Sequence, residues 1–518
     1  MATNSTIMRD PRSRVSEFAS SLTRQPLLVA LAVTTVIVCV RLAGSVDADV
    51  SWQLWAAHQM NGGARLYRDI VEINPPLWFW MGMPVDALAK LIHVRSDQAL
   101  IAIIGAIAAL SLAATDRLLP AMPATKRTFL LGFAALVLVA LPWLQFGQRE
   151  HIATIGALPY AALVAARRTG RNVPLGLACA VGAGAALGFA LKHYFLLVPI
   201  LLELWLLVSQ GRKWRPVRPE ALAMIGVGIG YAAAMAMWGT DYFSRALPII
   251  FISYGLTGAE RTIDLFQPSV LTALASLVLL IAHRRSLRSD PSGLASAMIV
   301  AAIGFGAAYF IQAKGWSYHA LPLAAFAVIA VAVSLTAESK PRFIVLVAPA
   351  LLLLPFWISA QQAIRGANPH PDVRHALAGL HAGDSVAFMG TDPSVGWPDT
   401  LDEGFRYPSR YSSFWMMRAV VRNAAADDPN PKVTQFGARV VEETVGDFEC
   451  MPPRRIIVAR PPAAAAKGEF DILAFFLRDP RFVQLLARYR PVSRTSVEAF
   501  ELVSPLPSRS DCIRRVTG

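Results

Sequence analysis

The chain has 518 residues, of which 55% are hydrophobic and only 16% are charged. Its mean hydropathy is +0.45, and soluble domains carry about a quarter charged residues. These values exclude an ordinary soluble domain and indicate a multi-pass membrane protein. The net charge of +14 is divided into short clusters between apolar runs, which is typical of membrane topology rather than of a nucleic-acid-binding surface.

The N-terminal segment 1–25 is basic and precedes the first apolar run, 25–42. This arrangement also occurs in secretory signal peptides. No small-x-small cleavage site follows, however, and Arg41 stands at the end of the run. We therefore interpret 1–25 as a cytoplasmic tail and the run as an uncleaved first membrane helix.

The apolar runs predict an α-helical polytopic protein with about eleven transmembrane helices, because a span needs roughly 20 apolar residues. The predicted membrane domain is 26–360, and its first outside loop is 45–98. The predicted spans are 26–44, 99–116, 128–146, 151–166, 173–191, 194–210, 220–238, 268–283, 294–312, 318–336 and 342–360.

The distribution of basic residues supports this list, since Lys and Arg are enriched in cytoplasmic loops. With the N-terminus inside, the basic clusters fall on inside segments, and the short outside loops carry few cations. If 76–92 were a membrane span, every later loop would lie on the opposite side of the membrane, and the basic clusters would be outside. We therefore expect 76–92 to be an interfacial helix, with Trp78 and Trp80 at headgroup level. A single helix over 173–210 would also reverse the topology, so Lys192 is expected in an outside turn between two helices.

Residues 361–518 are more polar and Pro-rich, and the topology places them outside. We expect a small extracytoplasmic α/β domain there, with strands at 385–390, 455–460 and 496–503 and a helix around 482–489. Cys450 and Cys512 lie in this region and can pair if it is extracytoplasmic. The spacing of His and Cys contains no dedicated metal motif. We expect no cofactor, although a divalent cation stays open.

The outside loops carry polar side chains beside aromatic residues, a combination that the inside loops lack. Ionisable groups at a membrane edge are costly and usually functional. Cations and His suit an anionic, lipid-linked substrate, and a carboxylate can deprotonate a hydroxyl. The candidates outside the first loop are Arg149, Glu150, Lys192, His193, Arg261, Lys314 and His319.

The first outside loop has the most specific pattern, and its residues carry a resemblance. Asp47, Asp49, Trp52, Ala56, Ala57, Tyr67, Asp69, Glu72, Asn74, Pro75 and Pro76 form it. The pattern resembles the first extracytoplasmic loop of the GT-C glycosyltransferases, in the bacterial branch related to protein O-mannosyltransferases and lipid A aminoarabinose transferases. The resemblance covers 26–210 and implies a GT-C-like fold with a polyprenyl-phosphate sugar as donor.

The resemblance also assigns roles to residues. Asp49 matches the catalytic Asp, the general base for the acceptor, and Asp47 is an additional acid that competes for this match. Glu72 matches the acid before Pro-Pro, and Arg149-Glu150 resembles a basic/acidic pair. Tyr67 and Asn74 would belong to the substrate-binding residues, although relatives often have Lys at the position of Asn74.

Structural interpretations compete with these roles. Asp47 and Asp49 are typical helix N-caps, and Glu72 suits a solvated loop. Arg149-Glu150 is also typical of an ion pair at a helix end, and Lys192 and Lys314 of anchors at the interface. The Trp residues of the first loop, Trp52, Trp55, Trp78 and Trp80, are mostly expected in an interfacial belt.

Together these features predict an inverting glycosyltransferase of the bacterial inner membrane. It would move a hexosyl or pentosyl group from a polyprenyl-phosphate carrier to a hydroxyl of a lipid, glycan or protein on the outer face. The alternative is a transporter or flippase for a lipid-linked or anionic substrate, and a weaker one is a glycan polymerase or ligase. The sugar, the acceptor, the carrier length and the oligomeric state are open.

Overall fold

A computed structural model describes residues 25–256, 263–282, 284, 290–337, 356–357, 371–459, 470–494, 497–505 and 512. The fold is mainly helical, with one small sheet near the C-terminus. The contacts divide the chain into two compact units. The first contains 1–44, 101–229 and 262–361, and the second contains 45–100, 230–261 and 362–518.

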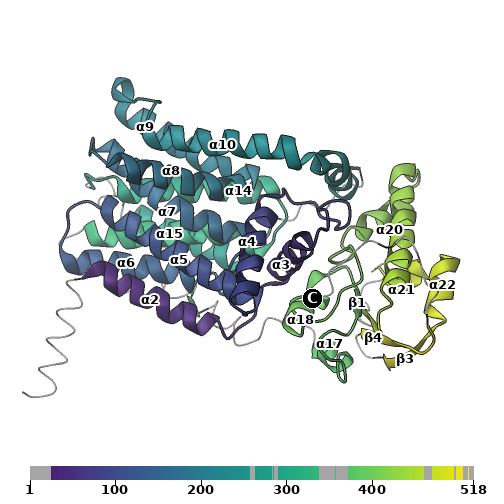
Figure 1. Cartoon of the computed structure of the whole chain (residues 1–518). Coiled ribbons are helices and arrows are strands. Elements are labelled where there is room, and N and C mark those ends of the chain that lie inside the picture. The colour runs from purple at the N-terminus through teal and green to yellow at the C-terminus, as the bar shows by residue number, and fades with distance from the viewer. Residues whose placement is uncertain are drawn as a thin grey trace, which may run out of the picture. The chain divides into compact units, whose positions relative to one another are not determined.

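The first unit is a bundle of apolar helices (Figure 1). Five helices in the described part of the chain are long and apolar enough to cross a membrane, and three shorter helices are apolar as well. The chain is therefore a multi-pass membrane protein. The helices that lie in the first unit, α5 and α10 only in part, are α2 (Pro26–Arg41), α5 (Ser96–Leu118), α6 (Ala124–Val139), α7 (Arg149–Arg168), α8 (Leu175–Ala190), η1 (His193–Leu196), α9 (Leu197–Gln210), η2 (Gly211–Lys213), α10 (Pro219–Trp238), α12 (Pro268–Ala282), α14 (Leu294–Gln312), η5 (Ser317–Ala320) and α15 (Leu321–Ala337).

Most predicted spans correspond to these helices. The region 173–210 forms two helices, α8 and α9, and Lys192 lies in the connection between them, as the basic clusters predict. The predicted span 342–360 lies outside the described residues apart from 356–357.

Small residues allow the helices of this unit to approach closely. A Cβ on Gly182 of α8 would lie 2.3 Å from the backbone oxygen of Glu220 at the start of α10, so only glycine fits there. Such contacts replace part of the hydrophobic driving force, which is weak between helices in lipid.

The second unit contains a four-stranded sheet of order β1-β2-β4-β3. Strands β1 (Val386–Met389) and β2 (Arg455–Ala459) are parallel, whereas β4 (Val497–Leu502) is antiparallel to β2 and to β3 (Tyr489–Arg494). Three of these strands lie in the predicted segments, so the predicted extracytoplasmic domain does contain a small α/β fold. The helices of this unit are α3 (Ala48–Asn61), α4 (Leu77–Leu91), η3 (Tyr242–Ala246), α11 (Leu247–Ile250), η4 (Phe251–Leu256), α17 (Pro371–Ala376), η6 (Pro393–Val395), α18 (Asp399–Asp402), α19 (Met417–Ala424), α20 (Pro431–Cys450), α21 (Ile472–Phe476) and α22 (Pro480–Leu486).

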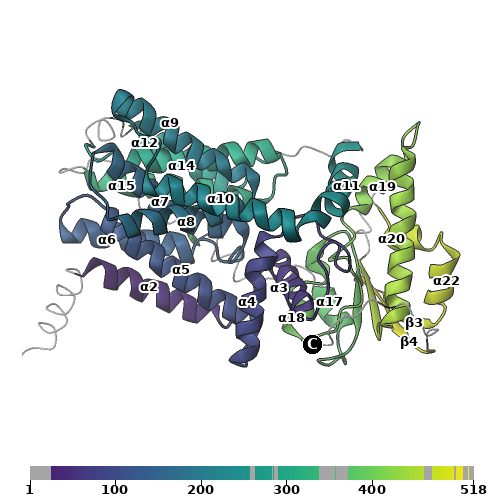
Figure 2. The same cartoon turned by 45° about the horizontal axis from the view of Figure 1, so that its top comes forward.

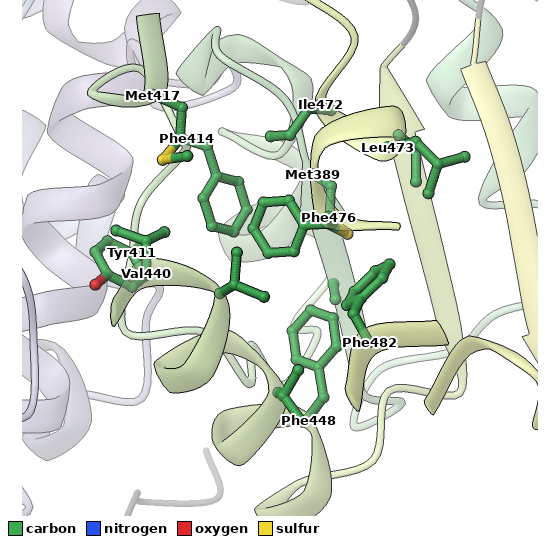
Figure 3. Packing of buried hydrophobic residues seen from close by; sticks show 14 of the residues in the cluster. Met389, Tyr411, Phe414, Met417, Val440, Phe448, Ile472, Leu473, Phe476 and Phe482 are labelled. Carbon is green, nitrogen blue, oxygen red and sulfur yellow. The ribbon is translucent and has the colours of Figure 1, made fainter. Parts of the chain in front are cut away.

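One face of the sheet packs against helices of the tail itself. Ala387 and Met389 of β1 point to this face because side chains alternate along a strand. Helix α20 covers the face with a stripe of buried apolar residues at helical spacing. Figure 3 shows this cluster, in which Phe476 and Phe482 pack edge to face with ring centroids 5.1 Å apart.

The opposite face of the sheet is covered by the first outside loop. Val386 and Phe388 of β1 share a buried cluster with Trp52 and Trp55 of α3. The sequence divides the chain at 360/361, but the contacts group loop 45–100 with the tail. The reason is that α3 packs on the second face of the sheet, whose apolar side chains are buried against Trp52 and Trp55.

Helix α4 occupies the segment expected to lie in the interface. It belongs to the second unit, and packs closely on α3, where a Cβ on Gly82 would lie 3.1 Å from Ala57 Cβ. Trp78 is only 3% exposed. The indole of Trp78 is therefore covered by protein atoms, and its depth in the membrane stays a prediction.

A disulfide joins Cys450, the last residue of α20, to Cys512, with their Cα atoms 5.4 Å apart. It closes a loop with a sequence separation of 62. We expect Cys450→Ser/Cys512→Ser to lower the free energy of unfolding of the tail by roughly 2–4 kcal/mol, since the cross-link restricts the unfolded chain. Thermal unfolding of the two proteins measures this effect. Equal unfolding midpoints for the wild type with and without reductant would contradict the expectation.

Candidate functional site

The start of α7 carries consecutive buried polar residues. Gln148, Arg149, Glu150 and His151 are each at most 3% exposed. His151 is explained structurally, because its Nδ1 accepts a hydrogen bond from Gly147 N at 3.1 Å and its Nε2 lies 2.6 Å from Leu138 O. The neighbouring Arg149 and Glu150 are the basic/acidic pair singled out in the sequence.

Glu150 belongs to a buried ionic cluster, which we define as Glu150, Lys192, His319 and Gln312. Lys192 Nζ donates to Glu150 Oε1 at 2.5 Å and to Gln312 Oε1 at 3.4 Å. It also lies 3.0 Å from His319 Nε2. The structure thus brings together three predicted site residues that lie far apart in the sequence.

The geometry of the cluster fixes the protonation of His319. Because a lysine ammonium can only donate, His319 Nε2 must accept the bond from Lys192, which places the ring proton on Nδ1. His319 Nδ1 and Glu150 Oε2 are buried and have no hydrogen-bond partner among the described residues. Such buried polar atoms are costly unless a ligand or water satisfies them.

The other predicted cations are arranged differently. Lys314 lies over the ring of Trp316 at 5.0 Å, in the connection between α14 and η5. His193 is exposed and packs against the ring of Tyr194 at 3.9 Å. Arg261 lies outside the described residues.

In the second unit, Asp47 is the N-cap of α3. Its side chain accepts a hydrogen bond from Asp49 N at 2.9 Å, which satisfies a backbone donor at the helix start. Asp49 lies in the first turn, partly exposed. The structural interpretation therefore accounts for Asp47 as the N-cap, whereas Asp49 is a second acid in the first turn and is not the N-cap residue.

Glu72 is the centre of a compact hydrogen-bonded turn. Its Oε2 accepts from Trp52 Nε1 at 2.9 Å, and its Oε1 accepts from Ile73 N, Asn74 N and Asn74 Nδ2 at 2.7, 2.9 and 2.7 Å. Tyr67 donates to Asn74 O at 2.6 Å, and burial raises the pKa of its hydroxyl. Glu72 thus connects the turn to α3 through Trp52.

The Trp residues of α3 are buried rather than interfacial. Trp52 is 3% exposed, and Trp55 is 6% exposed. Trp52 stacks on Trp55 with centroids 4.8 Å apart, and both lie against Trp397 and Tyr407 of the tail. The belt interpretation is therefore wrong for these two residues. Their spacing of three positions on one helix is the signal that favours a packed face.

Sequence reasoning also missed the importance of Tyr254 in η4. Burial raises the pKa of the Tyr254 hydroxyl, and the negative charges of Asp49 and Glu72 raise it further. Tyr254 therefore lies within electrostatic range of both carboxylates. The sequence shows Tyr254 only as one aromatic residue of a long loop.

A buried acid holds α3 against α4. Asp86 accepts from His58 at 3.0 Å and from Asn61 at 2.8 Å, and Lys90 lies 3.0 Å away. Burial raises the pKa of the Asp86 carboxyl, but the hydrogen bonds from these three residues outweigh burial and lower that pKa to about 2.

This lowered pKa predicts a pH dependence. A carboxyl whose folded-state pKa lies below the unfolded value of 3.8 stabilises the fold above that pH, and the stabilisation is lost as the pH falls towards 2. We expect Asp86→Asn to cost roughly 2 kcal/mol at pH 7. The difference between the wild type and Asp86→Asn in thermal unfolding should shrink from pH 5 to pH 3. A difference that stays constant over this range would contradict the assignment.

Among the described residues, no group of three or more His, Cys, Asp or Glu is placed to hold a metal ion.

No sequence-family model and no curated protein matches the chain. Among solved structures, it is similar to ArnT from Cupriavidus metallidurans bound to undecaprenyl phosphate, with a TM-score of 0.53 and 13% identity over 93% of this chain and 99% of that chain. Arabinofuranosyltransferase AftD from Mycobacteria matches with a TM-score of 0.48 and 14% identity, over 93% of this chain and 40% of that one. The archaeal oligosaccharyltransferase AglB from Archaeoglobus fulgidus, in complex with an inhibitory peptide and a dolichol-phosphate, matches with a TM-score of 0.43 and 11% identity, over 85% and 70%.

The similarity to ArnT extends over nearly all of both chains and includes both units described above. It agrees with the fold that the first outside loop predicts. The chain therefore has the fold of the GT-C glycosyltransferases.

Proposed function

We propose that the protein is an integral-membrane glycosyltransferase that moves a sugar from a polyprenyl-phosphate carrier to an acceptor hydroxyl. The observation that carries this proposal is the GT-C fold over nearly the full length, shared with a protein solved with undecaprenyl phosphate. The position of Asp49 in the first turn of the helix after the first membrane span supports it.

Asp49 is the general base in this proposal. Its carboxylate takes the proton of the acceptor hydroxyl while the acceptor oxygen attacks the anomeric carbon of the donor. The bond from that carbon to the phosphate oxygen breaks, and polyprenyl phosphate leaves with the electron pair. A single displacement of this kind inverts the configuration at the anomeric carbon.

Cations of the membrane unit hold the phosphate. Arg149 and Lys192 are buried, and together they carry more charge than the neighbouring Glu150. In a medium of low dielectric constant, this excess positive charge stabilises the leaving phosphate. His319 adds a ring N–H at Nδ1 that can donate to an anionic oxygen.

We propose that the reaction takes place on the outer face of the bacterial inner membrane. The basic clusters favour a cytoplasmic N-terminus. The disulfide of the tail fits an oxidising compartment. With this orientation the tail and the first loop are extracytoplasmic.

The test uses the purified full-length protein in lipid nanodiscs with synthetic polyprenyl-phosphate hexoses and pentoses. We expect release of polyprenyl phosphate that depends on an added envelope extract, together with a sugar-sized mass increase of one extract component. Mass analysis of envelope glycolipids and glycans from cells with and without the protein identifies the acceptor. Movement of intact donor across liposome membranes without release of polyprenyl phosphate would instead support a transporter.

A further inference from the structure

Two aromatic side chains from distant parts of the second unit form a stacked pair. Tyr254 lies in the π-helical segment η4, and Trp415 lies just before α19. Their ring centroids are 5.5 Å apart, and the rings are inclined by 20°. Segment η4 follows α11 in the chain and contacts α19. Figure 2 shows α11 and α19 next to each other. π-Helical turns are rare and often occur at functional sites.

The backbone around Trp415 is held firmly. Phe414 and Met417 on either side are fully buried and belong to the cluster in Figure 3. Phe414 packs on Phe476 with centroids 5.3 Å apart. Trp415 packs against the same cluster but is only half-buried, and Tyr254 is half-buried as well. The buried neighbours of Trp415 therefore fix its backbone, and part of each ring of the pair stays exposed.

Polar residues lie on the segments next to Trp415, at the end of the first strand. Phe414 N donates to Gly390 O at 2.8 Å, which places Trp415 near the residues that follow β1. Arg418 is exposed and donates to Thr391 Oγ1 at 3.4 Å, and the neighbouring Asp392 is exposed as well. Strands β1 and β2 are parallel, and the carboxyl ends of parallel strands are where α/β folds commonly bind ligands.

The pair also lies near the proposed base. The charge of Asp49 contributes to the raised pKa of the Tyr254 hydroxyl, so the phenol ring and that carboxylate are close enough to interact. All these residues belong to the same compact unit. An acceptor seated on the pair would therefore be bound by the same compact unit that carries the group that takes its proton.

We propose that Tyr254 and Trp415 form an acceptor subsite for a carbohydrate, so that the acceptor of this enzyme is a glycan. Aromatic rings pack against the apolar C–H face of a sugar ring, and a few charged or hydroxyl groups then fix its hydroxyls. Arg418, Thr391 and Asp392 supply these groups. Arg418 is exposed three residues after Trp415, and Asp392, which also caps the turn Pro393–Val395 by accepting from Ser394 N at 2.9 Å, is exposed as well. The inference rests on the proposed glycosyl transfer and names the acceptor class.

The first experiment measures binding rather than transfer. The probe is a panel of soluble tetrasaccharides of mannose, glucose, galactose and arabinose, added to the full-length Asp49→Asn protein in nanodiscs. We expect saturable binding of at least one tetrasaccharide and an increase in Kd of roughly tenfold or more for Trp415→Ala and for Tyr254→Ala. Trp415→Tyr, which keeps an aromatic ring, should bind nearly as well as Trp415. Phe251→Ala is the matched control, because Phe251 lies on the same segment and is 57% exposed.

The second experiment measures transfer with the native Asp49. The subsite variants should raise the KM for the glycan acceptor about tenfold and change kcat little, and the KM for the donor should stay the same. A merely structural role for the pair would change both KM values and the thermal unfolding midpoint together. If Trp415→Ala fails to fold, Trp415→Tyr still tests the subsite, because it keeps an aromatic ring at this position.

The two hypotheses fail in different ways. If the wild type releases no polyprenyl phosphate from any donor, the proposed function is wrong, and the binding experiment still decides the subsite. If transfer occurs but no tetrasaccharide binds, or if Trp415→Ala binds as the wild type does, the subsite is overturned. Binding of a Ser/Thr-rich peptide or of lipid A vesicles at the pair, in place of the tetrasaccharides, overturns it as well.

Discussion

Asp49→Asn should lower the turnover of glycosyl transfer by about two to four orders of magnitude, the usual contribution of a general base. The substitution keeps the shape and the helix start, because the N-cap bond is made by Asp47 and not by Asp49. Donor binding should therefore stay within a factor of about two, since the donor phosphate is assigned to cations of the membrane unit. Single-turnover transfer and equilibrium binding of the donor measure the two quantities separately.

Asp47→Asn is the matched control for this prediction. Asn is as good an N-cap as Asp, so the hydrogen bond to Asp49 N can be kept. We expect near-normal turnover and less than about 1 kcal/mol of lost stability. If Asp47→Asn abolishes transfer and Asp49→Asn does not, the base is Asp47. Full transfer in both variants would show that the base is neither Asp47 nor Asp49.

Lys192→Met should strongly destabilise the membrane unit. It leaves Glu150, which is fully buried, without its partner at 2.5 Å. Breaking a buried ion pair from one side typically costs about 3–5 kcal/mol, because the remaining charge stays desolvated. Thermal unfolding in detergent measures the loss.

The double variant Lys192→Met/Glu150→Gln separates stability from function. With neither charge present, the stability should return to within roughly 1–2 kcal/mol of the wild type. Donor binding should still be weaker by about tenfold or more, because a phosphate-binding cation is missing. Arg127→Gln serves as the control, since its ion pair with Asp116 is partly exposed and should matter little. Donor affinity that recovers together with stability would show that Lys192 has only a structural role.

The membrane helices and three strands of the tail could be predicted because their signals are local. Apolar runs and basic clusters determine the membrane spans. Short runs of residues whose side chains alternate between the two faces of a strand determine β1, β2 and β4. Helix α20 was missed although its sequence has the usual signs, with Asn430 as N-cap, Pro at the first turn and apolar residues three and four apart.

The packing of the first loop could not be predicted, because it depends on non-local contacts. Trp52 and Trp55 resemble interfacial residues as long as the surface that buries them is unknown. In the same way, Glu72 resembles a solvated or catalytic acid until Trp52 and Asn74 are found to donate to it. The cluster of Glu150, Lys192 and His319 was predicted as a set of charges near one membrane face, but not as direct partners.

The sheet of the tail, with one face covered by α3, has a consequence for folding order. Residues 45–100 are synthesised long before the strands that they cover, and Ser45 and Asp402, 357 positions apart, are joined by a hydrogen bond of 2.5 Å. Until β1 and β2 exist, the indoles of α3 lack their final partners, and until α3 docks, one face of the new sheet is bare. Such distant pairing is slow and exposes apolar surface during assembly. The isolated tail should therefore aggregate when produced alone, and co-production with a segment that contains α3 should keep it soluble.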